Sequence, residues 1–163
     1  MEQYQIVKAE SSDKDFVIKL NMENMPAVGG LDEESFDRFT KYSDYFKVIR
    51  FDKELVGFMI ALLPGRPYSS VNYKWFEKKY SSFVYIDRIV ISFDYQNKGL
   101  GSLFYDDLKN GFKNKNDFLA CEFNLIPRND ISMKFHKKYG FDEVGQQYTD
   151  QKKKLVSMQI LPI

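Results

Sequence analysis

The apolar and polar positions of this chain follow two periods, one typical of strands and one typical of helices. Apolar runs, several of them alternating, predict seven strands, over residues 5–9, 45–51, 55–63, 84–91, 118–125, 141–148 and 155–161. Apolar residues three to four apart predict four helices, which begin near Asp13, at Asp32, after Gly101 and at Asn129 or Asp130. This order predicts an α/β (α+β) fold with a mixed sheet of about seven strands and helices on both faces.

One segment does not fit either period. Residues 64–67 are Pro-Gly-Arg-Pro, and residues 68–82 then place Tyr73, Trp75, Phe76 and Tyr80 among lysines. We expect a long connection here, with room for one helical turn. Long connections in compact domains are often functional or mobile.

Length and composition narrow the class of protein. The chain has 163 residues, 44% of them apolar and 29% charged, which predicts a single globular domain over residues 1–163. The net charge of +1 gives no electrostatic reason to expect nucleic acid or an anionic membrane as a partner. The first residues lack the pattern of a signal peptide, and the apolar runs are shorter than the ~20 residues of a membrane span, so we expect a cytoplasmic protein.

The single cysteine excludes an intramolecular disulfide. Cys121 lies in an apolar run and is expected to behave as a small core residue. Cys121 and His136 are too few for a metal site, so we expect no metal.

A glycine-containing turn links the strand at 84–91 to the following helix. Its residues are Gln96-Asn97-Lys98-Gly99-Leu100-Gly101. A helix N-terminus preceded by glycines suits a phosphate, because its N–H groups are unpaired and a ligand can approach the backbone closely. Phe104 stands where the third glycine of a dinucleotide fingerprint belongs, and no Gly-Lys-Ser or Gly-Lys-Thr occurs. The spacing alone leaves open a phosphate site or an ordinary strand–helix turn.

A second cluster lies near the C-terminus, over residues 127–141. Asn129, Ser132 and either Phe135 or His136 fall on one face of the predicted helix, which could line a cleft. The alternative is structural, with Asn129 as an N-cap and Phe135 in the core.

Together the two clusters resemble the GNAT superfamily, the Gcn5-related N-acetyltransferases. The acyl-CoA signature of that family is Gln or Arg, two residues, Gly, one residue, and Gly or Ala, which residues 96–101 match. The later segment resembles the one in which an Asn caps a helix that ends in Gly-Phe, here Asn129 and Gly140-Phe141. One departure is Asn97, where many members carry Gly; Asn tolerates a left-handed backbone better than most residues.

The resemblance implies a GNAT fold, whose strands 4 and 5 splay apart around acetyl-CoA. It assigns the coenzyme's pyrophosphate to the backbone of Gln96, Asn97, Lys98, Gly99, Leu100, Gly101 and Ser102. It assigns the pantetheine arm to Ile89, Val90 and Ile91 and to Asn129, Ser132 and Phe135.

Acetyl transfer to an amine needs a base, because an alkylamine is mostly protonated at neutral pH. Asp87 and Glu122 are the candidates, since each is a carboxylate within an apolar strand. The alternative is that they pair with Arg88 or Arg128, or hydrogen-bond to a loop. A strand N–H such as that of Ile91 could stabilise the oxyanion.

The resemblance also places a proton donor for the departing thiolate. Many members carry a Tyr four residues before the Gly of Gly-Phe, and here that position is His136. A His can donate a proton near neutral pH, so His136 is either the acid or a binding contact without proton transfer.

The sequence therefore predicts an acetyl-CoA-dependent N-acetyltransferase that acts on a primary amine of a small molecule or a protein. The alternative is a catalytically inactive GNAT-fold module that binds coenzyme A as a sensor. The aromatic residues of the segment at 68–80 suit a partly apolar or cationic acceptor, or else a lid or dimer contact. Many members are dimers, so a homodimer is compatible with the resemblance.

Overall fold

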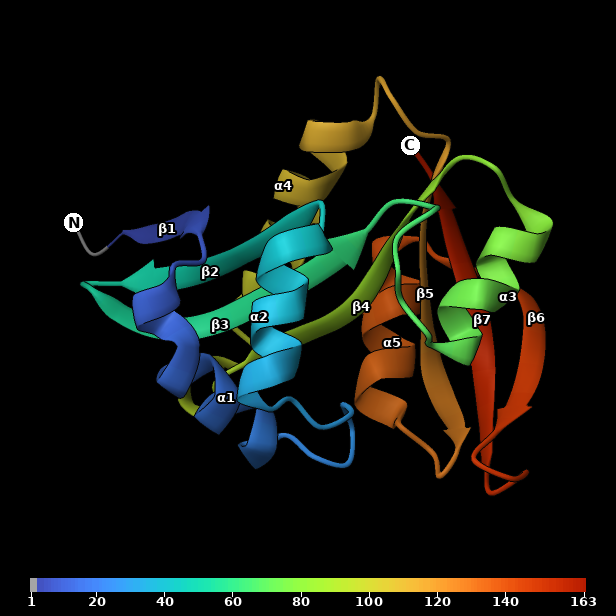
Figure 1. The fold of residues 1–163 in the computed structure, drawn as a ribbon, viewed down its shortest axis with the longest axis horizontal. Helices are drawn as coiled ribbons and strands as arrows, with labels where there is room; N and C mark the ends of the chain where they lie inside the picture. The colour runs from blue at the N-terminus through green and yellow to red at the C-terminus, as the bar shows by residue number, and fades with distance from the viewer. Residues whose placement is uncertain (1–2) are drawn as a thin grey trace. The chain divides into compact units, whose positions relative to one another are not determined.

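The computed structural model describes residues 3–163 and contains one seven-stranded mixed sheet with the strand order β1-β2-β3-β4-β5-β7-β6 (Figure 1). The strands are β1 (Tyr4–Lys8), β2 (Tyr45–Phe51), β3 (Glu54–Leu62), β4 (Phe83–Ile91), β5 (Phe118–Ile126), β6 (Asp142–Thr149) and β7 (Lys154–Pro162). The helices are α1 (Lys14–Glu23), α2 (Glu33–Tyr42), α3 (Val71–Lys79), α4 (Leu100–Phe112) and α5 (Asp130–Tyr139), with short 3₁₀ helices at Ser11–Asp13 (η1) and Phe93–Tyr95 (η2). The predicted strands and four of the helices are confirmed, with boundaries shifted by a few residues.

The chain forms two compact units, which we describe separately. The first comprises residues 3–62 and 86–111, and the second comprises residues 63–85 and 112–163. The parallel pairing of β4 with β5 lies in the second unit, from Phe83–Phe118 to Tyr85–Ala120. The turn at 96–101, which resembles the acyl-CoA signature, belongs to the first unit, and the segment at 129–141 belongs to the second.

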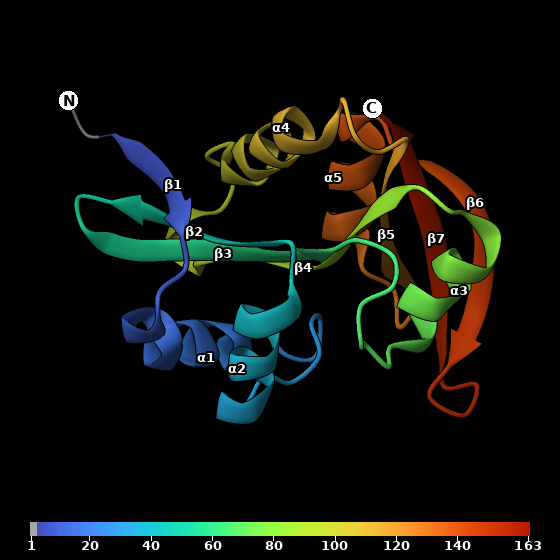
Figure 2. The ribbon, with the colours of Figure 1, turned by 45° about the horizontal axis from the view of Figure 1, so that its top comes forward.

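In the first unit, helices cover both faces of the strands. Figure 2 shows α1 and α2 on one side of β2 and β3 and α4 on the other. Phe36 of α2 packs edge-on against Phe46 of β2, with the ring centroids 5.2 Å apart. On the opposite face, Asp107 of α4 accepts hydrogen bonds of 2.7 Å from both the Tyr45 hydroxyl and the Lys47 ammonium. Alternate residues of β2 therefore anchor helices on opposite faces, as the two-residue period requires.

In the second unit, α3 and α5 lie on opposite faces of β5. Glu122 of β5 accepts a hydrogen bond from Asn72 of α3, whereas the next residue, Phe123, packs against His136 of α5. Successive side chains of a strand point to opposite faces, so these two contacts fix the placement of the two helices.

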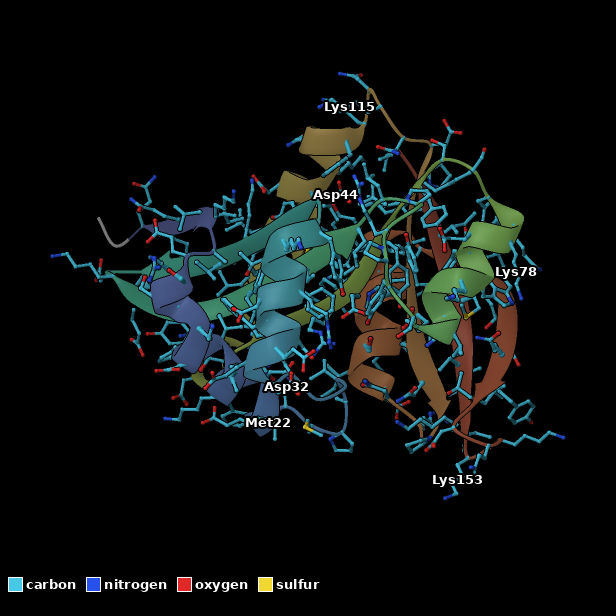
Figure 3. All side chains as sticks on the ribbon, viewed as in Figure 1. Met22, Asp32, Asp44, Lys78, Lys115 and Lys153 are labelled. Carbon is cyan, nitrogen blue, oxygen red and sulfur yellow. The ribbon has the colours of Figure 1, made fainter. Side chains whose placement is uncertain are left out.

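The helix α3 is the main departure from the sequence prediction, which expected a long connection with one helical turn. The Ser70 hydroxyl caps the helix by accepting from the Tyr73 N–H, and Tyr73 and Phe76 are fully buried. The polar side of α3 carries lysines, among them Lys78, which Figure 3 labels. The aromatic residues of this segment thus include two core residues of the second unit, and truncating them would perturb folding as well as any ligand contact.

Candidate functional site

The turn before α4 has the backbone that its sequence predicts. Asn97 and Gly99 both lie in the left-handed region, with φ of 60° and 80°. The Gln96 side chain donates to the Ile91 carbonyl at 3.1 Å, which ties the turn to the end of β4. The Leu103 N–H donates to the Gly99 carbonyl at 3.0 Å, so the helix begins directly after Gly99. Asn97 therefore adopts a left-handed backbone, which Asn tolerates better than most residues.

The start of α4 is suited to an anion. The first N–H groups of a helix have no carbonyl partner within the helix, and they carry the positive end of its dipole. The first turns of α1, α2 and α5 contain acidic residues, whereas those of α3 and α4 contain none. A phosphate at Leu100, Gly101 and Ser102 would thus meet N–H donors without a competing carboxylate, and Lys98 adds a cation beside them.

The end of β4 alternates between two environments. Arg88 and Val90 are buried, whereas Ile89 and Ile91 are only partly buried. Arg88 points to the face that α1 and α2 cover, because its guanidinium contacts Asn21 of α1 and lies over the Phe39 ring of α2. Ile89 and Ile91 belong to the opposite face of the strand.

Asp87 forms an ion pair with its neighbour in sequence. Its carboxylate accepts from Arg88 Nε at 2.7 Å, and both side chains are less than a tenth exposed, at 6% for Asp87 and 8% for Arg88. Arg88 also donates to the side chain of Asn21 at 3.0 Å and to the carbonyls of Gly29 and Gly30 at 3.1 and 3.3 Å. The pairing of Asp87 with Arg88 that the sequence offered as an alternative is present in the structure.

Glu122 has a different set of neighbours. Its Oε1 accepts from the Tyr85 hydroxyl at 2.8 Å and from the Asn72 amide at 3.2 Å. Asn72 in turn accepts from Gln147 of β6 at 3.0 Å. The proposed partner Arg128 instead pairs with Asp130. Glu122 is therefore held by neutral donors from β4 and α3.

Sequence reasoning missed Tyr85 and Asn72. Tyr85 is opposite Ala120 in the parallel pairing, which places its side chain on the face of β5 that Glu122 shares, two residues further along. The only signal in the sequence is a hydroxyl-bearing side chain two residues before Asp87 in an apolar run. Asn72 gave no signal, because the helix that carries it was not predicted.

The N-terminus of α5 has the predicted cap. Asn129 Oδ1 accepts from the Ser132 N–H at 3.2 Å, and Gly140 ends the helix with a φ of 116°. Phe135 packs edge-on against His136, with the centroids 5.3 Å apart. The capping role of Asn129 is thus present in the structure.

His136 is buried within the second unit, with 4% of its surface exposed. Its Nδ1 lies 2.7 Å from the Ser132 carbonyl oxygen, and because a carbonyl only accepts, Nδ1 carries the proton. Burial lowers the pKa of His136, and the hydrogen bond to Ser132 opposes this effect. At neutral pH the ring is therefore neutral, and Nε2 is a hydrogen-bond acceptor. This state suits a proton acceptor or a binding contact better than a proton donor.

The candidate residues thus form two groups, each within one unit. The first unit contains Asp87, the end of β4 and the turn at 96–102, and the second contains Glu122, Asn129, Ser132, Phe135 and His136. The sequence profile described as "Acetyltransferase (GNAT) family" matches residues 14–141, most of the chain.

The chain belongs to the GNAT family of acetyltransferases.

Solved structures support the same fold. The chain aligns with Ard1 from Thermoplasma volcanium at a TM-score of 0.76 and 16% identity, covering 98% of this chain and 97% of that one. For the ribosomal-protein-S18-alanine N-acetyltransferase from Escherichia coli, the TM-score is 0.72 at 15% identity, with 99% and 94% of the chains covered. Arabidopsis thaliana Naa50, solved with the bisubstrate analogue CoA-Ac-MVNAL, gives 0.71 at 16% identity, with 98% and 99% covered. At these identities, the likeness shows the fold alone.

No curated protein sequence matches this chain. Within residues 3–163, no helix combines the length and the apolar character that a membrane-spanning helix needs.

Proposed function

We propose that this protein is an acetyl-CoA-dependent N-acetyltransferase that acts on a primary amine of a small molecule or a protein. The observation that carries the proposal is the turn before α4. It combines two left-handed residues, a helix start without acidic residues and Lys98, in a chain of the acetyltransferase family. When bound, acetyl-CoA would supply the acetyl group as a thioester.

The residues of this turn fit the pyrophosphate of coenzyme A. Gly99 has open space where a side chain would be, so a phosphate can approach its backbone. We assign the phosphates to the N–H groups of residues 96–102, with Lys98 as a cationic partner. The family resemblance assigns the pantetheine arm to Ile89, Val90 and Ile91 and also to Asn129, Ser132 and Phe135.

We assign the general base to Glu122 in preference to Asp87. Asp87 is fixed by an ion pair to Arg88, which itself holds the backbone of residues 29 and 30. Glu122 is oriented by the Tyr85 hydroxyl of β4 and the Asn72 amide of α3. A carboxylate held in this way can take a proton from an ammonium group, directly or through water.

The acceptor is assigned only as a class. One structural neighbour is named as an N-acetyltransferase of ribosomal-protein-S18-alanine, and another was solved with the bisubstrate analogue CoA-Ac-MVNAL. These acceptors and analogues are those of the neighbours. For this chain, we infer an amine, of either a small molecule or a protein.

The donor site is tested with Gly101→Glu. A Glu side chain in the first turn of α4 would repel phosphate. It should not destabilise the helix, because Glu has a higher helix propensity than Gly and its negative charge interacts favourably with the helix dipole. We expect acetyl-CoA to bind at least about tenfold more weakly, measured by calorimetry, without loss of thermal stability. The matched control is Gly111→Glu at the other end of the same helix, where a Cβ has open space. Equal affinity of the two variants would reject the phosphate assignment.

Turnover is tested by incubating the protein with acetyl-CoA and a panel of amines, with products detected by mass. A gain of one acetyl group on an amine supports the enzyme. Binding of acetyl-CoA with no acetylated product would favour the sensor. No binding of acetyl-CoA would reject both.

A further inference from the structure

A cleft of about 590 Å³ lies in the first unit, and of its lining residues only Lys98 is assigned to the proposed reaction. Six residues line it, from β1, the β2–β3 hairpin, η2 and the following turn: Tyr4, Phe51, Glu54, Asp94, Tyr95 and Lys98. The volume is that of a small-molecule site.

Three aromatic rings form one part of the lining. The Tyr4 and Phe51 centroids are 4.8 Å apart, and those of Phe51 and Tyr95 are 5.8 Å apart. The face of an aromatic ring carries the negative part of its quadrupole, so it attracts a cation placed over it.

Two carboxylates add negative charge. Glu54 Oε2 accepts from the Tyr95 hydroxyl at 3.1 Å, which fixes the carboxylate beside the ring. Asp94 precedes Tyr95 in η2. Within residues 3–163, neither carboxylate forms an ion pair. The lining thus has two carboxylates and one lysine, and its net charge is negative.

The position of the Lys98 ammonium indicates that this lining attracts a cation. Its Nζ lies over the Tyr95 ring, 4.9 Å from the centroid. The cleft therefore already receives an ammonium group from the protein itself. Lys98 lies between the left-handed residues Asn97 and Gly99 and is exposed, so its long side chain can leave the ring without rearrangement of a core.

We propose that this cleft binds an organic cation, an ammonium or guanidinium group carried by a small ligand, in competition with the Lys98 side chain. The aromatic faces would contact the cation, and Glu54 and Asp94 would balance its charge. An anionic ligand is disfavoured, because two carboxylates face it against one lysine. This site lies outside the residues assigned to acetyl transfer, except that Lys98 is shared with the phosphate turn.

Choline is a suitable probe, and neohexyl alcohol is its neutral carbon isostere. Titrations followed by NMR, in the absence of acetyl-CoA, should show choline shifting the ring signals of Tyr4, Phe51 and Tyr95. Choline should bind at least about threefold more tightly than neohexyl alcohol. Equal binding of the two compounds, or shifts outside the cleft only, would overturn the proposal.

Two variants test whether Lys98 competes with the bound cation, because they are expected to change the affinity for choline in opposite directions. Lys98→Met should tighten choline binding about threefold, because it removes the internal competitor. Glu54→Gln should weaken it by a similar factor. Lys115→Met and Glu23→Gln are the controls; both residues are exposed, and Figure 3 labels Lys115. Weaker choline binding by Lys98→Met would show that the lysine does not compete with the cation, and it would overturn the proposal.

The outcome is independent of the acetyltransferase proposal. The titrations use no acetyl-CoA, so a failure to bind choline leaves the donor site untouched. Conversely, a failure of Gly101→Glu to weaken acetyl-CoA binding leaves the cation site untouched.

Discussion

Asp87 and Glu122 are both carboxylates within apolar strands, but their neighbours differ. Asp87 accepts from a buried guanidinium, and that guanidinium also holds the side chain of Asn21 and the carbonyls of residues 29 and 30. Glu122 accepts from a phenol and an amide at one oxygen. The first arrangement fixes the chain segment after α1, whereas the second orients the Glu122 carboxylate through a hydroxyl and an amide.

The comparison shows that a carboxylate in an apolar strand is not by itself a sign of catalysis. A buried ion pair that ties several backbone groups together is explained by the fold, since breaking it would leave a buried charge unpaired. A carboxylate held by neutral donors needs another explanation, and proton transfer supplies one.

The largest expected effect is that of Glu122→Gln. Loss of a general base lowers kcat by about a hundredfold to ten-thousandfold, and the amide still accepts the hydrogen bond from Tyr85. The measurement is steady-state acetylation of the amine found in the screen, with thermal unfolding to confirm that the fold is kept.

Asp87→Asn and Glu23→Gln are the controls for this variant. Asp87→Asn should lower stability more than the kcat of the folded fraction, and Glu23→Gln should change neither. Equal losses of kcat for Asp87→Asn and Glu122→Gln would contradict the assignment of Glu122, in preference to Asp87, as the general base.

Arg88→Met comes next and tests the structural side of the comparison. Removing one partner of a buried ion pair destabilises a protein by about 3–5 kcal/mol, because the other charge is left without compensation. Urea unfolding of the variant should show a loss of this size.

The matched control is Arg38→Met on α2. Arg38 pairs with Glu34 at 2.7 Å, but their side chains are 53% and 79% exposed, so the loss should stay below about 1 kcal/mol. Similar losses for the two arginines would show that the buried network does not stabilise the first unit.

The smallest effect concerns His136, the only histidine in the chain. Its pKa is lowered by burial, so the unfolded chain binds the proton more readily than the folded one. The stability that this contributes is complete above the ordinary pKa of 6.5 and is lost as the pH falls below it. Unfolding free energies measured from about pH 8 to about pH 5 should therefore fall more steeply for the wild type than for His136→Gln.

The same variant distinguishes a role of His136 in proton transfer from a purely structural role. A buried neutral ring predicts that the shape of the pH profile of kcat is kept in His136→Gln. Loss of one limb of that profile would identify His136 as a group that transfers a proton in the reaction.

Much of the fold was predictable because its signals are local. The β2–β3 hairpin follows from two apolar runs around Asp52-Lys53, and both turn residues have positive φ, at 48° and 79°. Helix α3 was not predictable with equal ease, because it has nine residues and follows two prolines. The hydroxyl of Ser70 and the lysines at its end were the available signals.

The candidate site likewise has one part that local sequence predicts and another that it does not. The turn at 96–101 is one contiguous segment, and its motif could be read directly. The partners of Glu122 are 37 and 50 residues away in sequence, in Tyr85 and Asn72, so only the folded chain places them together. The contacts of Arg88 with residues 21, 29 and 30 are equally remote in sequence.

Trp75 is the only tryptophan, and its indole occupies the space beside Gly145, where an added Cβ would lie 2.6 Å from a ring carbon. Both residues belong to the second unit. The chain therefore contains a single-site optical reporter. Its fluorescence follows the second unit alone, while far-ultraviolet circular dichroism follows all helices and strands. The two signals, recorded in one denaturation, would tell whether the halves of this enzyme family's fold melt together or in sequence.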